Sequence, residues 1–248
     1  MEFTTEFLIF ASIVIFLSAL VQSTIGFGFP MIATPLLAMV TDVKTAVLYV
    51  VIPTLVINII LIYSEKEFKK AIKTFYPLAI FAMIGSAIGT QILIYTNAEI
   101  FKLLLSISII LYLFIQKYKL EFIFIRNNPK SSLVIFGLSA GIIGGLTNVM
   151  APILIIYYLE LKYTRKEIIQ SANICFFFGK LIQIFLFSIH GSFTQDVLTI
   201  SFASLVVVVF AMFIGIYIKN RIVENRYNQI IKNLLFLIAF VLLVQTVY

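Results

Sequence analysis

Residues 22–30 read QSTIGFGFP, a polar and glycine-rich patch inside an apolar stretch that runs from Phe7 to Val40. A helix that crosses a membrane needs about 20 mainly apolar residues, so this stretch is too long for one crossing. Glycine is poorly suited to the interior of a helix, and proline starts a helix or breaks it. The patch therefore predicts two helical legs with a turn between them, at membrane depth.

The composition of the chain is that of a membrane protein. Of its 248 residues, 62% are hydrophobic and 12% are charged, whereas soluble domains have about 25% charged residues. Cys175 is the single cysteine and there is one histidine, so we expect no disulfide framework, no metal site and no cofactor. The N-terminus carries Glu2 and Glu6 and no base, which favours a retained first segment over a cleaved signal peptide.

The rest of the chain is divided into further apolar segments. Six have about the length of one crossing: 46–63, 75–95, 99–116, 168–188, 197–218 and 228–247. The segment 133–159 is longer and is interrupted by GIIGGLTN at 141–148. It is therefore predicted to be a second broken segment, like 7–40.

The basic residues predict how the chain is oriented. Fifteen of the 18 Lys and Arg residues lie in four connections, at 66–73, 117–130, 162–166 and 219–232. Cytoplasmic loops carry the excess of bases, so these connections are expected inside, with both termini outside. The basic charge is then a topology signal, and we expect no nucleic-acid partner. Each broken segment must return to the side of the cell membrane from which it entered.

The two broken segments resemble each other. FGFPMIATPLL (27–37) lies over GGLTNVMAPIL (144–154), with Gly28 over Gly145 and Pro35 over Pro152. Each segment is followed by three crossings, and because three is odd the two halves are inverted relative to each other. We therefore predict one all-α, polytopic membrane domain built from two inverted-topology repeats, 1–125 and 126–248, each with a broken or hairpin segment and three transmembrane helices. Inverted repeats are typical of secondary transporters.

This repeated pattern of a glycine-rich run, a proline about seven residues later and a short charged turn resembles the sulfite exporter TauE/SafE family. The resemblance covers nearly the whole chain. It implies a transporter of sulfite, organosulfonates or related sulfur-containing anions, mostly outward across the plasma membrane. Here the first half has Gly26, Phe27 and Gly28, and the second has Gly144 and Gly145, where the family commonly shows a denser glycine run.

The turns of the two broken segments are the first candidate binding region. Each second leg starts near Pro30 or Thr34–Pro35, and near Thr147–Asn148 or Ala151–Pro152. A helix N-terminus attracts anions, so two such ends meeting at the centre would hold an oxyanion. The candidate substrate-binding residues at the turns are Gln22, Ser23, Thr24, Gly26, Phe27, Gly28, Gly144, Gly145, Thr147 and Asn148. Their polar side chains bind substrate oxygens or only satisfy the turn backbone; both readings stay open.

Lys180 is the second candidate, because it lies in the middle of the segment 168–188. A charge at membrane depth is costly and suggests function. On a helix, Asn173 and Lys180 project within about 20° of each other, and Gln170 and Gln183 flank them. This stripe should face the protein interior, with Lys180 as a partner of the anion. The alternatives are that Lys180 reaches an interface or caps backbone carbonyls. Asn58, on the matching helix of the first half, is a weaker candidate.

Small residues predict where helices approach closely. Gly137, Gly141 and Gly145 have GxxxG spacing, as do Gly85 and Gly89. Such spacing lets helix backbones pack against each other. The partner is another helix of the same chain or a second copy in a homodimer.

The residues at membrane depth do not favour an enzyme. They include no nucleophile with a base, no carboxylate pair and no metal ligands, which hydrolytic chemistry would need. We therefore predict a transporter of a small anion in the lipid bilayer. The alternatives are a passive anion channel, a transporter of another organic anion, or an assembly subunit.

Overall fold

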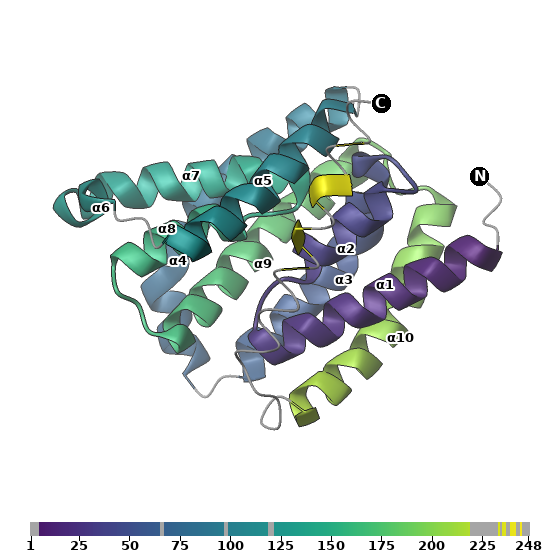
Figure 1. The fold of residues 1–248 in the computed structure, drawn as a ribbon, viewed down its shortest axis with the longest axis horizontal. Helices are drawn as coiled ribbons and strands as arrows, with labels where there is room; N and C mark the ends of the chain where they lie inside the picture. The colour runs from purple at the N-terminus through teal and green to yellow at the C-terminus, as the bar shows by residue number, and fades with distance from the viewer. Residues whose placement is uncertain are drawn as a thin grey trace.

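The computed structural model of the protein describes residues 5–64, 67–96, 99–118 and 122–218, and scattered positions between 233 and 244. The described elements are helices (Figure 1). In chain order they are α1 (Thr5–Ile25), α2 (Phe29–Ala38), α3 (Val43–Ser64), α4 (Phe68–Tyr95), α5 (Glu99–Tyr118), α6 (Ile123–Asn127), α7 (Pro129–Thr147), α8 (Ala151–Glu160), α9 (Arg165–Ile189) and α10 (Gln195–Ile218).

The structure confirms an all-α, polytopic membrane protein. Within the described ranges, six helices are long and apolar enough to cross a membrane: α1, α3, α4, α7, α9 and α10. The predicted crossings 46–63, 75–95, 168–188 and 197–218 each lie inside one helix, and 99–116 lies inside α5. The predicted crossing 228–247 falls largely outside the described residues. The short helix α6 was not predicted.

Both long segments are broken, and the second leg of the second one begins at Ala151–Pro152, one of the two starts that the sequence left open. The first break lies between α1 and α2, at residues 26–28. The second lies at residues 148–150, whereas the glycine-rich part of 141–148 continues α7 as far as Thr147. Glycine was a misleading signal there, because these glycines serve helix packing and not a turn.

The second helices of the two broken segments, α2 and α8, begin in the same way. In each, proline occupies one of the first two helical positions, Pro30 in α2 and Pro152 in α8. Proline is favoured there because its missing N–H has no partner to lose. The prediction that Pro35 matches Pro152 is therefore wrong, since Pro35 lies inside α2. Asn148 ends α7 in the left-handed conformation, with φ 69°.

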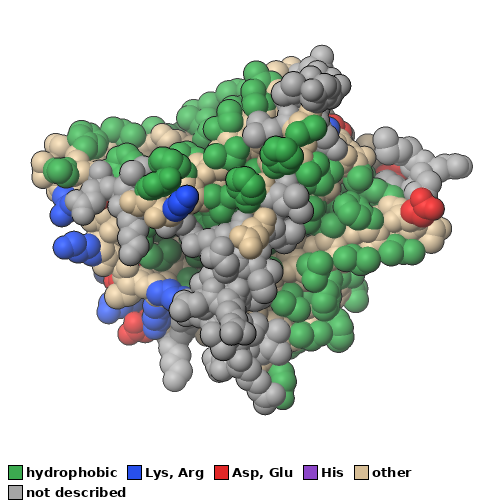
Figure 2. Space-filling view, viewed as in Figure 1, with side chains coloured by type: hydrophobic (Ala, Val, Ile, Leu, Met, Phe, Trp, Pro, Cys, Tyr) green, Lys and Arg blue, Asp and Glu red, His purple; other side chains and the backbone are tan. Residues whose placement is uncertain are grey.

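Three of the four basic connections gather on one face of the molecule. Lys166 lies 4.0 Å from Glu67, which joins the connections before α9 and before α4. Arg126 in α6 pairs with Glu160 at the end of α8. Figure 2 shows blue Lys and Arg side chains gathered at one end of the view, while hydrophobic side chains cover much of the rest. We call this the basic face.

The base-poor connections meet on the opposite face. The Tyr95 hydroxyl at the end of α4 lies 2.8 Å from His190 Nε2 at the end of α9, and Lys44 Nζ donates to the Ile94 carbonyl. The rings of Phe7 and Tyr49 bring the start of α1 to the start of α3. The segment α1–α2 therefore starts and ends on the base-poor face, and α7–α8 starts and ends on the basic face, as predicted.

Glycines bring α4 and α7 into direct backbone contact. A Cβ atom added at Gly85 or Gly89 would collide with the backbone of α7, and one added at Gly141 would collide with the Ala82 carbonyl oxygen and the Ser86 amide of α4. The GxxxG spacing thus serves packing inside the chain. This contact joins α7, in the middle of the chain, to α4 in its first half.

Gly141→Ala should destabilise the protein, because the added methyl group would force α4 and α7 apart. We expect a loss of about 1–3 kcal/mol, as for other overpacked interiors. The melting temperature of the detergent-purified protein measures it. Ile135→Ala on the exposed side of α7 is the control, since Ile135 is 48% exposed. An equal or larger effect of the control would contradict the packing role.

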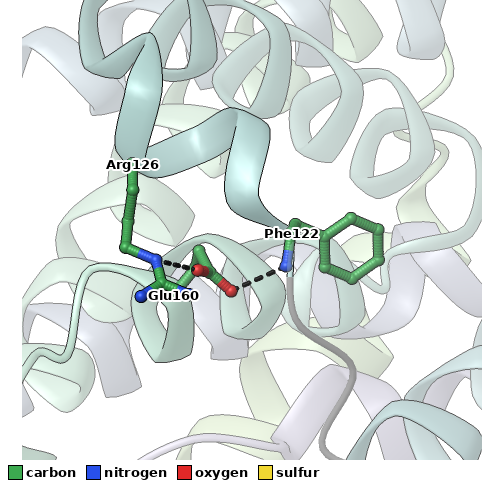
Figure 3. Close-up of polar contacts among 3 residues, drawn as sticks. All are labelled: Phe122, Arg126 and Glu160. Carbon is green, nitrogen blue, oxygen red and sulfur yellow. Dashed lines mark hydrogen bonds and ion pairs between the residues drawn. The ribbon is translucent and has the colours of Figure 1, made fainter.

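A carboxylate clamp holds α6 against the end of α8 (Figure 3). Glu160 accepts a hydrogen bond from the Phe122 backbone N–H at 2.7 Å and one from Arg126 Nε at 2.5 Å. The Phe122 amide and then Arg126 hold the pKa of Glu160 below its ordinary value, since both favour the charged carboxylate. The clamp thus fixes the connection before α7 to the end of α8.

The clamp should stabilise the protein at neutral pH and be lost in acid. A lowered folded-state pKa gives stability that is present above the unfolded pKa and disappears as the pH falls through the folded value. Between pH 7 and pH 4, the melting temperature of the wild type should therefore fall by more than that of Glu160→Gln. Parallel melting curves for the two proteins would contradict this assignment.

Candidate functional site

The first cluster of polar side chains surrounds the end of α1. Gln22 accepts a hydrogen bond at 2.6 Å from the backbone N–H of Phe29, the first residue of α2. Its Nε2 group donates to the side-chain oxygens of Asn58 in α3 and Asn173 in α9, at 3.4 and 3.3 Å. Asn173 in turn donates to the Gly26 carbonyl at 2.8 Å. We call Gln22, Asn58 and Asn173 the amide cluster; all three are buried.

The second cluster surrounds the end of α7. Lys180 Nζ donates to the side-chain oxygens of Asn148 and Gln183. Asn148 Nδ2 donates to the hydroxyl of Thr34 in α2 at 2.8 Å, and Gln183 Nε2 donates to the Gly145 carbonyl at 3.2 Å. We call Asn148, Lys180 and Gln183 the lysine cluster. It joins the second break, α9 and the second leg of the first broken segment.

The predicted residues therefore lie in two clusters and not in one central pocket. Both clusters use the polar stripe of α9, where Gln170, Asn173, Lys180 and Gln183 are buried. Asn173 and Lys180 are seven residues apart, which is about 10 Å along a helix. Because α9 begins at the basic face, the amide cluster lies nearer that face and the lysine cluster nearer the other.

Lys180 is one of the largest fully buried side chains, with 1% of its surface exposed. It does not reach an interface, and its two hydrogen-bond acceptors are side-chain amide oxygens rather than backbone carbonyls. Both alternative interpretations of this residue are therefore wrong in this structure. The hydrogen-bond partners of the Lys180 nitrogen are thus two neutral side-chain oxygens.

The hydroxyl groups beside the two breaks bond to their own helices. Ser23 donates to the Ala19 carbonyl, Thr24 to the Leu20 and Val21 carbonyls, and Thr147 to the Ile143 carbonyl. In each of these bonds the hydroxyl donates to a carbonyl of its own helix, and Thr147 Oγ1 also accepts from the Val149 N–H in the second break at 3.3 Å. A role of these side chains toward substrate oxygens stays a prediction.

The glycines at the first break are required by the backbone conformation. Gly26 has φ 102° and Gly28 has φ 121°, a region that other residues rarely adopt. A Cβ at Gly26 would also collide with the Ile169 side chain of α9. Phe27 between them lines a small apolar pocket with side chains of α8 and α9: Ala151, Leu154, Ile155, Tyr158, Ile168 and Ala172. The first break is thereby fitted against the second leg of the other broken segment.

The glycines before the second break serve packing. Gly144 leaves room for the Met150 side chain, and Gly145 lies against Ser86 and Thr90 of α4. Gly145 also supplies the carbonyl that accepts from Gln183. Gly144 is thus a spacer, and Gly145 contributes one backbone oxygen to the lysine cluster.

Sequence reasoning missed several residues of the two clusters. Thr34 is the partner of Asn148. Ser86 of α4 donates to the Gly179 carbonyl beside Lys180, and a Cβ at Gly179 would meet Met150. None has a sequence signal of its own, because threonine, serine and methionine are common in apolar helices. Only the fold brings them to the site.

The described residues contain no group of three or more His, Cys, Asp or Glu side chains that could hold a metal ion. The two clusters consist of amides, one ammonium group and backbone carbonyls. Amides and ammonium groups donate hydrogen bonds to oxyanions. The arrangement can bind an anion inside a membrane domain.

The chain forms a polytopic helical domain with two broken segments, and polar groups are buried at both breaks. These features define a class of integral membrane proteins in which such breaks line binding sites. The chain matches the family model described as "Sulfite exporter TauE/SafE" over residues 11–245. It belongs to this family of membrane transporters. No curated protein and no solved structure matches the chain.

The left-handed conformation of Asn148 can be tested by substitution. Asn148→Gly and Asn148→Ala both remove the contacts with Lys180 and Thr34, but only alanine is strained at φ 69°. We expect the alanine variant to be less stable than the glycine variant by about 1 kcal/mol. Melting temperatures of the two detergent-purified variants give the comparison. An alanine variant as stable as the glycine variant would argue against this backbone conformation.

Proposed function

We propose that the protein carries a small sulfur-containing anion, sulfite or an organosulfonate, out across the cell membrane, with Lys180 as the residue that binds the anion. The observation that carries this proposal is the lysine cluster: a fully buried ammonium group whose partners are the neutral oxygens of Asn148 and Gln183. A buried charge without an ionic partner is costly. A bound anion would supply that partner.

The transport mechanism that we propose rests on two inverted repeats. Several features recur at one constant separation along the chain: positive φ at Gly26 and Asn148, proline near the helix start at 30 and 152, and a buried polar residue at Asn58 and Lys180. Asp42 and Thr164 accept from backbone N–H groups at the starts of α3 and α9 in the same way. These recurrences support repeats at 1–125 and 126–248.

The packing of the helices supports the same repeats. If α1 corresponds to α7, α3 to α9 and α4 to α10, then α4 packed on α7 has its counterpart in α10 packed on α1. Likewise α4 on α9 corresponds to α10 on α3. The pairing of α1 with α10 is visible in Figure 1. Between such repeats, alternating access would expose the two clusters to opposite sides.

The basic face gives the orientation of the protein in the membrane. By the positive-inside rule it is cytoplasmic, so the N-terminus is outside. An anion that leaves the cell would then meet the amide cluster before the lysine cluster. The C-terminus, also predicted outside, lies beyond the described residues. Outward transport follows the family to which the chain belongs.

An anion channel is the alternative that shares both clusters. In both functions the anion would have to replace the contacts between Lys180, Asn148 and Thr34. A channel would need an open path past them. Saturation of the flux at low anion concentration would favour the transporter, while flux proportional to concentration would favour the channel.

Proteoliposomes that contain the purified protein should take up at least one of sulfite, sulfate, thiosulfate, sulfoacetate and taurine. Lys180→Ala should lower this uptake by at least tenfold, because the anion loses its charged partner. The measurement is the initial rate of uptake of each labelled anion. Lys102→Ala is a matched control, since it removes a lysine near the start of α5 and away from both clusters.

The outcomes separate the parts of the proposal. If no anion in the panel moves, the function is wrong. If an anion moves equally fast with Lys180→Ala, the function stands and the role of Lys180 is wrong. If Lys180→Ala and Lys102→Ala lose the same activity, the loss reflects general charge and not the lysine cluster.

A further inference from the structure

In the described part of the chain, Lys180 is itself the one charged group of its surroundings. Among the described residues, the buried charged side chains are Lys180 and Glu160, and Glu160 is paired with Arg126 at the basic face. The other groups that contact Lys180 or its partners are neutral: the amides of Asn148 and Gln183, the hydroxyl of Thr34 and the Gly145 carbonyl. The site therefore offers one positive charge to a ligand.

Resting on the proposed function, we infer that this site selects an oxyanion that carries one negative charge over an oxyanion of the same shape that carries two. One ammonium group neutralises one charge. A second negative charge would be buried without a partner, and an unpaired buried charge carries a large desolvation cost. The substrates that fit are hydrogensulfite and organosulfonates without a carboxylate.

The orientation of the two amides strengthens this selection. Asn148 and Gln183 both turn their oxygens toward Lys180, and each is held in that orientation by a bond from its nitrogen, to Thr34 and to Gly145. An anion that approaches Lys180 meets the negative ends of both amides. The attraction to the ammonium group and this repulsion both double for a dianion, whereas the cost of taking the ligand out of water grows faster than its charge, so the balance favours the monoanion.

The amide cluster adds hydrogen bonds without adding charge. Asn58 takes the place in α3 that Lys180 takes in α9, and it is fully buried. Its Nδ2 group has no hydrogen-bond partner, although its oxygen accepts from Gln22. An unpaired donor at this depth is suited to an oxyanion oxygen. The counterpart of Lys180 is thus a neutral donor, and the total positive charge of the two clusters stays at one.

Two matched pairs of anions test the inference. Methanesulfonate and sulfate have the same tetrahedral shape but one and two charges, and isethionate and sulfoacetate have similar lengths but one and two charges. Each is added as a competitor to wild-type proteoliposomes that take up a labelled anion shown to be transported. In both pairs we expect the monoanion to inhibit at a concentration at least tenfold lower than the dianion.

Equal or better inhibition by the dianion in either pair would overturn the inference, and so would an absence of inhibition by all four anions. The proposed function would survive both results, because it requires only that a sulfur-containing anion is transported. It fails separately, if no labelled anion enters the proteoliposomes at all.

Asn58→Lys provides a second test, because it places a second ammonium group at the position that corresponds to Lys180. A second positive charge beside the bound anion should improve inhibition by the dianions about tenfold relative to the monoanions. Asn58→Gln is the neutral control and should leave the ratio unchanged. If Asn58→Lys does not fold, Lys180→Gln gives the converse measurement: the preference for monoanions should shrink. An unchanged ratio in every folded variant would contradict selection by charge.

Discussion

The fold depends on one constraint, which is that polar groups at membrane depth must find partners inside the protein. A break in a helix leaves backbone N–H and C=O groups without helical partners, and in a bilayer no water replaces them. Here Gln22 takes the first N–H of α2 and Asn173 takes the Gly26 carbonyl. At the second break, Gln183 takes the Gly145 carbonyl and the Thr147 hydroxyl takes the Val149 N–H. Each break is thus bound to the rest of the fold by amide side chains.

Helix α9 is the element that connects the two breaks. Its buried face supplies Asn173 to the first and both Lys180 and Gln183 to the second. Because one rigid helix carries all three side chains, a movement of either broken segment must break bonds to α9. In the proposed function, an anion would replace some of the bonds that stabilise this arrangement.

Much of this architecture is predictable from local sequence. Helices in lipid must be apolar and about 20 residues long, and this identified the crossings and the two broken segments. The helical period placed Gln170, Asn173, Lys180 and Gln183 on one face, and the structure buries that face. The second leg begins at one of the two starts expected for it, but the glycines before it continue α7, because glycine has two uses, in turns and in close helix packing. The sequence does not say which of the two Gly144 and Gly145 serve.

The amino-acid sequence alone determined the class of protein, the breaks as a feature and the identity of the buried lysine, because these follow from hydrophobicity, charge and helical period over short stretches. The tertiary structure decided which polar groups meet. Gln22 and Asn173 are 151 residues apart, and Thr34 and Asn148 are 114 apart. No local pattern encodes such pairs, since they arise only when the packing of α4 on α7 and of α1 on α10 brings the two halves together. The division of the candidate residues into an amide cluster and a lysine cluster is therefore a property of the fold.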